Sequence, residues 1–319
     1  MDERGRRVAD EGTLERIRAL AIPPAWEDVW ICSLENGHIQ AVGTDARGRK
    51  QYRYHDDWRR RRDREKFDQS LDFGRALPRL RRRVAGQVSS RGATRERVLA
   101  GAVRLLDRGF FRIGGETYAE ENNSYGLATL LKRHARLEPR DVVVFDYPAK
   151  SGKRRLQTVV DRDVYRLVAE LKGRRGGSEE LLAYKNGRRW HDLRSADINE
   201  YVKEMTGGDF TAKDFRTWNA TVLAAVEVAR LSADAHSRTA RKRATTQAVE
   251  AVASYLGNTP AVCRASYIDP RVFDCFDAGV TIADALPASG EPDLDDAAVQ
   301  ARVERAVLDL LSDEDDSAA

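Results

Sequence analysis

Several residue types suited to phosphodiester chemistry occur in short, distinct motifs along this 319-residue chain. A tyrosine can attack phosphorus, and arginines can bind the non-bridging oxygens in a fork. A lysine can protonate the leaving oxygen, and an amide can donate one neutral hydrogen bond. In chain order, the residues that could supply these parts are Arg112 in FFRIG, Lys150 in YPAKSGK, Arg216 in KDFRT, and Asn258 and Tyr267 in GNTPAVCRASY.

Each of these residues also has an ordinary structural interpretation. A capped helix that holds one half-buried tyrosine, such as Tyr267, is common. Arg112 lies among apolar residues and needs a partner, which a carboxylate such as Glu120 or Glu121 could provide. Lys150 could be a solvated lysine in a turn. The set in this order, rather than any single member, therefore indicates attack of a tyrosine on a phosphodiester.

The elements that must position these side chains follow from apolar periodicity and helix caps. A helix over 94–110, capped by Thr94, ends directly before Arg112. Two strands, 141–147 and 155–160, predict a hairpin whose turn carries Lys150 and Lys153. A lysine at such a tip can reach the backbone of a nucleic acid.

The second arginine and the tyrosine belong to predicted helices nearer the C-terminus. A helix over 212–231, capped by Thr211, places Lys213 and Arg216 at i and i+3 on one face. The next helix, over 245–256, follows a polar loop and leads to Asn258, and a last short helix begins at Pro260. Further helices are predicted over 13–20, 67–88, 163–171, 195–205 and 298–311.

The N-terminal part has a β pattern. Strands are predicted over 29–32, 38–43 and 49–54. The last of these alternates, with Gln51 and Arg53 on one face and Tyr52 and Tyr54 on the other. Such a basic, aromatic antiparallel sheet can lie in a DNA groove, although a solvated strand edge protected by charge is the alternative.

Composition limits the possible classes of protein. Net charge is +4, but residues 291–319 carry a net −8, so the remaining residues carry about +12. This basic body favours a polyanionic partner, most simply nucleic acid. No stretch is apolar enough to span a membrane or form a signal core, so we expect a cytoplasmic protein. The three cysteines and five histidines form no metal-binding motif, and no metal is expected.

The motifs together resemble the small type IB DNA topoisomerases of poxviruses and bacteria. The similarity runs from about Ile22 to Arg271 and rests on five motifs in the family's order. These are the QYRY strand at 51–54, FFRIG with Tyr118 six residues after Arg112, the YPAKSGK hairpin, KDFRT, and GNTP followed by Tyr267.

The resemblance implies an α+β fold in three parts. These are a small antiparallel β-rich N-terminal DNA-binding domain (1–66), a larger, mostly α-helical catalytic domain with a small β-sheet (67–290), and an acidic C-terminal tail (291–319). The charge-dense residues 55–66 predict a linker that leads into a helix of the catalytic domain. The two domains would form a C-shaped clamp around duplex DNA. The family's activity is ATP- and metal-independent relaxation of supercoils through a covalent 3′-phosphotyrosyl intermediate, by a monomer that needs no cofactor and is associated with the nucleoid.

The resemblance also assigns roles to single residues. Tyr267 matches the nucleophile, and Arg112, Lys150 and Arg216 match the basic triad. Asn258 occupies a position where many members have histidine and some bacterial members have asparagine. The expected DNA contacts are Gln51, Tyr52, Arg53, Tyr54, Tyr118, Lys153 and Lys213. Gly115 and Glu116 stand where poxvirus members have basic residues, so no target sequence is assigned from those members.

Two other functions fit part of the pattern. A tyrosine recombinase shares the chemistry but typically has HxxR where this chain has Lys213-Asp214-Phe215-Arg216. The string at 191–194, HDLR, imitates that motif but precedes KDFRT. A non-catalytic DNA-binding protein would use the same basic face and leave the ordered catalytic set to chance.

Overall fold

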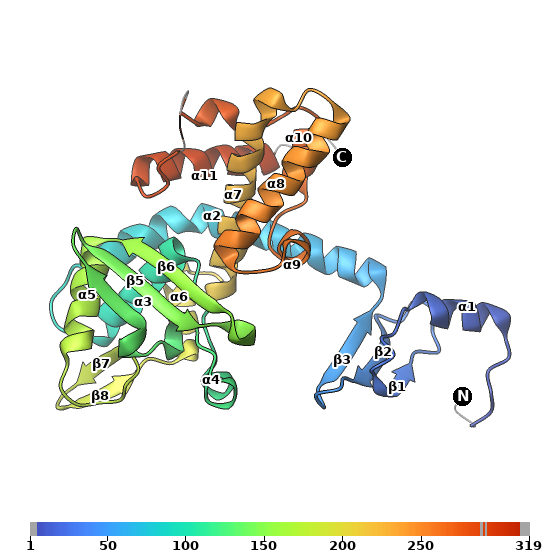
Figure 1. The fold of residues 1–319 in the computed structure, drawn as a ribbon, viewed down its shortest axis with the longest axis horizontal. Coiled ribbons are helices and arrows are strands. Elements are labelled where there is room, and N and C mark those ends of the chain that lie inside the picture. Colours follow the sequence, from blue (N-terminus) through green and yellow to red (C-terminus); the bar gives the residue numbers. More distant parts are fainter. Residues whose placement is uncertain (1–4, 288–289, 291, 313–319) are drawn as a thin grey trace. The chain divides into compact units, whose positions relative to one another are not determined.

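The computed structural model describes residues 5–287, 290 and 292–312, without the side chains of Tyr118, Glu120 and Ser151. The chain is an α+β protein with small antiparallel sheets (Figure 1). It divides into two compact units, Met1–Asp68 and Gln69–Ala319. The first unit is β-rich and the second is mostly helical, which confirms this part of the predicted fold class.

The first unit contains one antiparallel sheet in the order β1-β2-β3. Its elements are α1 (Glu11–Ala19), β1 (Glu27–Ile31), β2 (Ile39–Thr44) and β3 (Lys50–Tyr54), each within two residues of its predicted bounds. The turn before β3 is organised by Asp45, whose Oδ1 accepts the backbone N–H groups of Arg47 (2.9 Å) and Arg49 (3.0 Å). This turn fixes the register that pairs Val42 with Tyr52.

Residues 56–66 are helical, so the linker predicted for 55–66 is wrong. Helix α2 (Asp56–Val88) begins inside this charge-dense segment. Its side chains pair at helical spacing, with Arg61 Nε 2.9 Å from Glu65 Oε1 and Lys66 Nζ 3.1 Å from Asp63 Oδ1. Such pairs, together with two acidic residues in the first turn, stabilise a helix that has few apolar residues.

The core of the second unit is built around α3 (Arg95–Gly109), which packs against three other helices. These are α5 (Arg162–Gly173), α6 (Ser195–Thr206) and α7 (Ala212–Leu231). The predicted cap of α3 is confirmed, because Thr94 Oγ1 accepts the N–H of Arg97 at 3.2 Å. At the other end of α3, the carbonyl of its C-cap residue Phe110 accepts a hydrogen bond from Arg216 of α7, so the segment that leads to Arg112 lies beside α7.

Two small antiparallel sheets complete this side of the second unit. β4 (Ala135–Glu138), β5 (Val142–Pro148) and β6 (Arg154–Val160) form one sheet in that order, and α5 packs against it. β7 (Ala183–Asn186) and β8 (Arg189–Asp192) form the other. The β5–β6 hairpin confirms the prediction, while β4 and β8 were not predicted as strands. The short helix α4 (Glu116–Asn122) follows the Arg112 segment.

Helices α2 and α7 meet closely at Gly74. A Cβ added there would lie 2.7 Å from Cη2 of Trp218, a buried residue of α7. Glycine weakens a helix, but here its lack of a side chain allows the two helices to approach. α2 therefore packs against the helix that carries Arg216.

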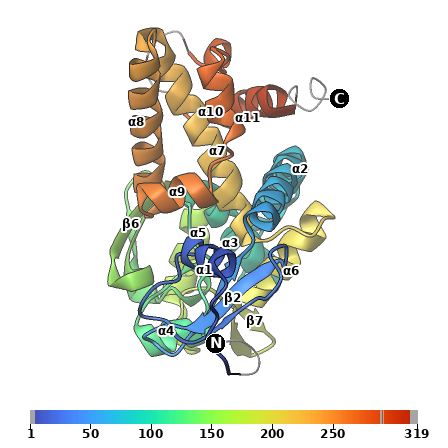
Figure 2. The same ribbon diagram turned by 90° about the vertical axis from the view of Figure 1, so that its right-hand side faces the viewer.

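The C-terminal helices pack on α7 (Figures 1 and 2). α8 (Arg238–Leu256) begins seven residues before the predicted start, because Ser237 Oγ accepts the N–H of Ala240 at 3.1 Å and caps it. α9 (Pro260–Ser266) and α10 (Arg271–Asp277) follow. α11 (Ala297–Ser312) buries Val303, Val307 and Leu311, so this acidic region contributes a packed helix. No helix within the described residues is long and apolar enough to span a bilayer.

Candidate active site

The segment that carries Arg112 is held by a close crossing of two loops. The carbonyl oxygens of Arg112 and Ile113 accept the N–H groups of Leu127 and Ala128, both at 2.8 Å. Gly114 has φ +82°, and a Cβ there would lie 2.9 Å from the Cα of Gly126. Only glycine fits this approach, so the glycine of the FFRIG motif fixes the backbone beside Arg112.

Arg216 is a nearly buried cation with no carboxylate partner among the described residues. Its side chain is 4% exposed. Its Nη1 donates to the carbonyl of Phe110 at 2.5 Å and its Nη2 to that of Leu256 at 3.0 Å, while Nε is buried without a partner. Burial and the nearby charge of Arg112 lower the pKa of Arg216 to about 10. An anion in the site would relieve this uncompensated charge.

Tyr267 lies at the end of α9, against Arg216. Thr259 Oγ1 caps α9 by accepting the N–H of Val262 at 3.4 Å, and the Tyr267 N–H donates to the Cys263 carbonyl at 3.0 Å. The half-buried ring has its centroid 5.2 Å from Cζ of Arg216. Burial alone would raise the pKa of Tyr267, but the charges of Arg216 and Arg112 and hydrogen bonds with both lower it overall.

Asn258 is oriented by Arg112. The Nη2 of Arg112 donates a hydrogen bond to the Oδ1 of Asn258. Because a guanidinium only donates, the carboxamide oxygen must face it, and this settles the direction of the amide. The Nδ2 of Asn258 is buried and has no partner. The arrangement therefore holds a neutral donor ready beside two arginines.

Lys150 stands at the tip of the β5–β6 hairpin, in a 3₁₀ turn over Lys150–Gly152. The hairpin pairs Pro148 with Arg154 just below the tip, and the lysine side chain is exposed. A cavity of about 180 Å³ separates the hairpin from Asn258. Its lining includes six cations and no carboxylate: Arg112, Lys150, Lys153, Arg154, Arg155 and Arg216. Such a cavity suits a phosphate group.

The structure thus brings Arg112, Arg216, Asn258 and Tyr267 into one cluster, with Lys150 across the cavity from it. The carboxylate partner suggested for Arg112 is replaced by Asn258, as far as the described side chains show. His191 of the HDLR string lies in β8, where it stacks on Tyr184 at 5.5 Å. No group of three or more metal-ligating side chains occurs among the described residues.

The predicted DNA contacts of the first unit lie on β3. Tyr52 and Tyr54 share one face, as predicted, with ring centroids 6.2 Å apart, and Tyr54 also stacks on Trp58 at 4.3 Å. Gln51 Nε2 donates to Asp45 Oδ2 at 2.9 Å. Arg53 lies 3.9 Å from a carboxylate oxygen of Asp56. One face of β3 therefore presents aromatic rings, and the other carries Gln51 and Arg53.

The remaining predicted contacts belong to the second unit. Lys213 is exposed in the first turn of α7, and Lys153 is exposed at the end of the hairpin turn. Tyr118 lies in α4, and its side chain is outside the description.

Two cations that line the 180 Å³ cavity, Arg154 and Arg155, were not predicted from the sequence. Arg155 of β6 lines the 180 Å³ cavity and donates from Nη1 to the Ser254 carbonyl at 3.1 Å and from Nη2 to the Tyr255 carbonyl. Arg155 lies two residues before the buried Gln157 and four before the buried Val159. Because side chains alternate along a strand, it is on the same, inward face of β6. An arginine on that face is a usable signal, but arginine is the common cation of this chain.

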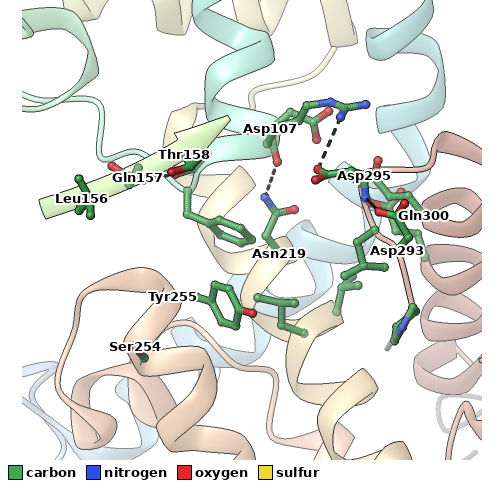
Figure 3. A pocket seen from close by; sticks show the side chains of 18 of the residues that line it. Asp107, Leu156, Gln157, Thr158, Asn219, Ser254, Tyr255, Asp293, Asp295 and Gln300 are labelled. Carbon is green, nitrogen blue, oxygen red and sulfur yellow. Dashed lines mark hydrogen bonds and ion pairs between the residues drawn. The ribbon is translucent and has the colours of Figure 1, made fainter. Parts of the chain in front are cut away.

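A second, larger cavity shares lining residues with the first (Figure 3). Its volume is about 540 Å³, and it is lined by residues of α3, β6, α7 and α8 and by 292–295, 300 and 304. Figure 3 shows Ser254 and Tyr255 on one side and Asp293 and Asp295 on the other. Phe110 and Arg155 line both cavities, whereas no member of the cluster lines the larger one.

Comparisons with known proteins show which family the chain is similar to. Residues 55–272 match the family described as eukaryotic DNA topoisomerase I, catalytic core, and residues 1–45 match bacterial DNA topoisomerase IB, N-terminal domain. A DNA topoisomerase 1B of Acanthamoeba polyphaga mimivirus is 32% identical over 273 residues, covering 80% of this chain and 77% of the relative. DNA topoisomerase 1 beta of Arabidopsis thaliana is 25% identical over 161 residues, covering 50% of this chain and 16% of the relative.

Proposed function

The chain belongs to the type IB DNA topoisomerases, an isomerase family, and we propose that it relaxes supercoiled DNA by transient cleavage of one strand. The phenolic oxygen of Tyr267 attacks a backbone phosphorus and forms a 3′-phosphotyrosyl bond, which releases a 5′-hydroxyl. The free end rotates, and the 5′-hydroxyl then attacks back and restores the strand. ATP is not needed, because the covalent bond keeps the energy of the phosphodiester.

The cluster supplies what this reaction requires. The pentacoordinate state carries more negative charge than the ground state, and positioned donors stabilise it. Arg112 and Arg216 donate to the non-bridging oxygens, and the unpartnered Nδ2 of Asn258 adds a neutral hydrogen bond. Lys150 protonates the leaving 5′ oxygen, since an ammonium gives up a proton and a guanidinium does not. No step requires a metal or other cofactor.

Duplex DNA is the proposed substrate, bound by a C-shaped clamp. Residues 1–66 form the β-rich DNA-binding domain, 67–290 the catalytic domain, and 291–319 an acidic C-terminal segment. Four residues of β3 contact the DNA: Gln51, Tyr52, Arg53 and Tyr54. The catalytic domain contributes Tyr118, Lys153 and Lys213. We propose that the enzyme acts as a monomer on the nucleoid in the cytoplasm.

One observation carries the proposal: the half-buried ring of Tyr267 lies 5.2 Å from Cζ of Arg216, and its pKa is lowered by the charges of Arg216 and Arg112, neither of which has a carboxylate partner among the described residues. The test is relaxation of positively and negatively supercoiled plasmid in EDTA without ATP. Relaxation of both is expected. A protein that only binds DNA would relax neither. A recombinase would instead join two DNA partners in a synaptic strand-exchange assay, which we expect to be negative here.

A further inference from the structure

Arg155 connects the hairpin that carries Lys150 to the last turn of α8, which leads into the loop that carries Asn258. Its backbone belongs to β6, where it pairs with Tyr147 of β5. Its guanidinium reaches the last turn of α8 and donates to the carbonyl groups of Ser254 and Tyr255. These carbonyls are at the negative end of the helix, where a cation is favourable. The side chain therefore caps the C-terminal carbonyl groups of α8 from the hairpin.

The loop that follows α8 depends on this contact. Gly257 has φ +64°, and a Cβ there would lie 3.0 Å from Nη1 of Arg155, so the guanidinium lies directly against the loop backbone. Two N–H groups also tie the loop to α8, Gly257 to Ser254 at 3.2 Å and Asn258 to Ala253 at 3.0 Å, and Arg216 donates to the Leu256 carbonyl directly before it. Asn258 is the next residue, and its Oδ1 is already engaged by Arg112. A shift of the loop would therefore move the free Nδ2.

The hairpin itself does not need Arg155. The β5–β6 ladder pairs seven residues, from Val142–Val160 to Pro148–Arg154, and this pairing reaches the base of the turn that holds Lys150. Arg155 is also not a core-packing residue, since it borders both the 180 Å³ and the 540 Å³ cavities. Its hydrogen bonds to the end of α8 are thus its main structural contribution.

We propose that Arg155 is a positioning residue that holds the Gly257–Asn258 loop, so that the Nδ2 of Asn258 is directed at the scissile phosphate. This inference rests on the proposed function. One N–H of each Nη of Arg155 is taken by a carbonyl oxygen of α8, and in this proposal Arg155 acts through Asn258 rather than on the phosphate. Its removal should slow the chemical step and leave the affinity for DNA nearly unchanged.

A double-mutant cycle on Arg155→Ala and Asn258→Ala tests this at saturating duplex DNA, with the single-turnover rate of covalent adduct formation as the readout. Asn258→Ala should be slower by about 10²-fold, the usual effect of one lost donor. Arg155→Ala should be slower by roughly 10- to 100-fold because the donor is misplaced. The double variant should be no more than about threefold slower than Asn258→Ala, since both changes remove the same contribution.

Three further measurements make the test specific. Arg155→Lys should recover part of the rate, because a lysine can still donate to one carbonyl. A 5′-bridging phosphorothiolate should not rescue Arg155→Ala, because the leaving-group step is intact. Arg136→Ala removes an exposed arginine of β4 that pairs with Glu138, and should leave the rate unchanged.

Other outcomes would overturn the inference. Rate losses that multiply in the double variant would mean that Arg155 acts independently of Asn258. If Arg155→Ala lowered the slope of log Kd against log salt concentration by about one phosphate contact, Arg155 would be a direct DNA ligand. If Arg155→Ala does not fold, Arg155→Lys takes its place in the cycle, and a rate loss that multiplies with that of Asn258→Ala would equally refute the role. A wild-type protein that forms no adduct would instead refute the proposed function.

Discussion

The guanidinium of Arg112 donates a hydrogen bond to the Oδ1 of Asn258, a residue 146 positions further along the chain. The contact joins the FFRIG and GNTP motifs and leaves the Nδ2 of Asn258 buried without a partner. An asparagine held in this way can serve as a fixed neutral donor, which is the role proposed for it beside the phosphate. The role needs a hydrogen bond and no proton transfer.

The charge of this side chain should matter more than its size. Asn258→Asp keeps the shape and can still accept from Arg112, but it places an anion beside the phosphate. We expect its single-turnover cleavage to be slower than that of Asn258→Ala, which itself loses about 10²-fold. Measurement of both rates at saturating DNA checks this. Cleavage by Asn258→Asp at the wild-type rate would contradict the assignment of Asn258 as a donor to the phosphate.

Lys150 should be required only for the leaving group. Lys150→Ala should cleave an ordinary duplex very slowly and recover on a 5′-bridging phosphorothiolate, whose thiolate leaves without an acid. Lys153→Ala, at the end of the same turn, is the matched comparison. It should bind DNA more weakly, and its cleavage rate relative to wild type should be the same on the phosphorothiolate as on the ordinary duplex. Equal rescue of the two variants, or none for Lys150→Ala, would remove Lys150 from the acid role.

The pH profile of cleavage should reflect the environment of Tyr267. Arg216 and Arg112 outweigh burial and hold its pKa below the usual 10.0. A lower pKa gives more phenolate at a given pH, so the rate should rise with pH and level off below pH 10. Arg112→Gln removes one of these charges, so the midpoint of its remaining activity should move to higher pH. An unshifted midpoint would show that the titrating group is not the phenol beside Arg112.

Two glycines of α2 provide a test of the packing that supports Arg216. A Cβ at Gly74 would lie 2.7 Å from Trp218, whereas nothing lies within 4 Å of a Cβ at Gly86. Gly74→Ala should therefore destabilise the protein by about 1–3 kcal/mol through overpacking. Gly86→Ala should stabilise it by about 0.5–1 kcal/mol, because alanine is the better helix residue. Denaturant unfolding measures both, and a stabilised Gly74→Ala would contradict the described approach of α2 and α7.

Local signals in the sequence predicted the elements that carry the site. Thr94 and Thr211 cap α3 and α7 as expected, and the turn chemistry around Lys150 predicted the hairpin. These features depend on neighbouring residues, so the sequence reveals them directly. The N-terminal part of α2 was missed because charge pairs, rather than apolar periodicity, stabilise it.

The contacts that complete the site could not be predicted in the same way. Arg216 donates to the Phe110 carbonyl across 106 positions, and Arg155 reaches the end of α8 across about 100. Such contacts depend on how the helices pack, and one arginine among many carries no local sign of its partner. The motifs indicated the participants in the chemistry, while the packing decides which of them touch.

Covalent trapping of Tyr267 tests the central proposal most directly. Wild-type protein incubated with duplex DNA and denatured should carry one DNA strand, and peptide mapping should place the 3′-phosphate on Tyr267. Tyr267→Phe should bind the same duplex with similar affinity and carry none. An adduct at normal yield in Tyr267→Phe, or a strand attached to another residue, would contradict the account.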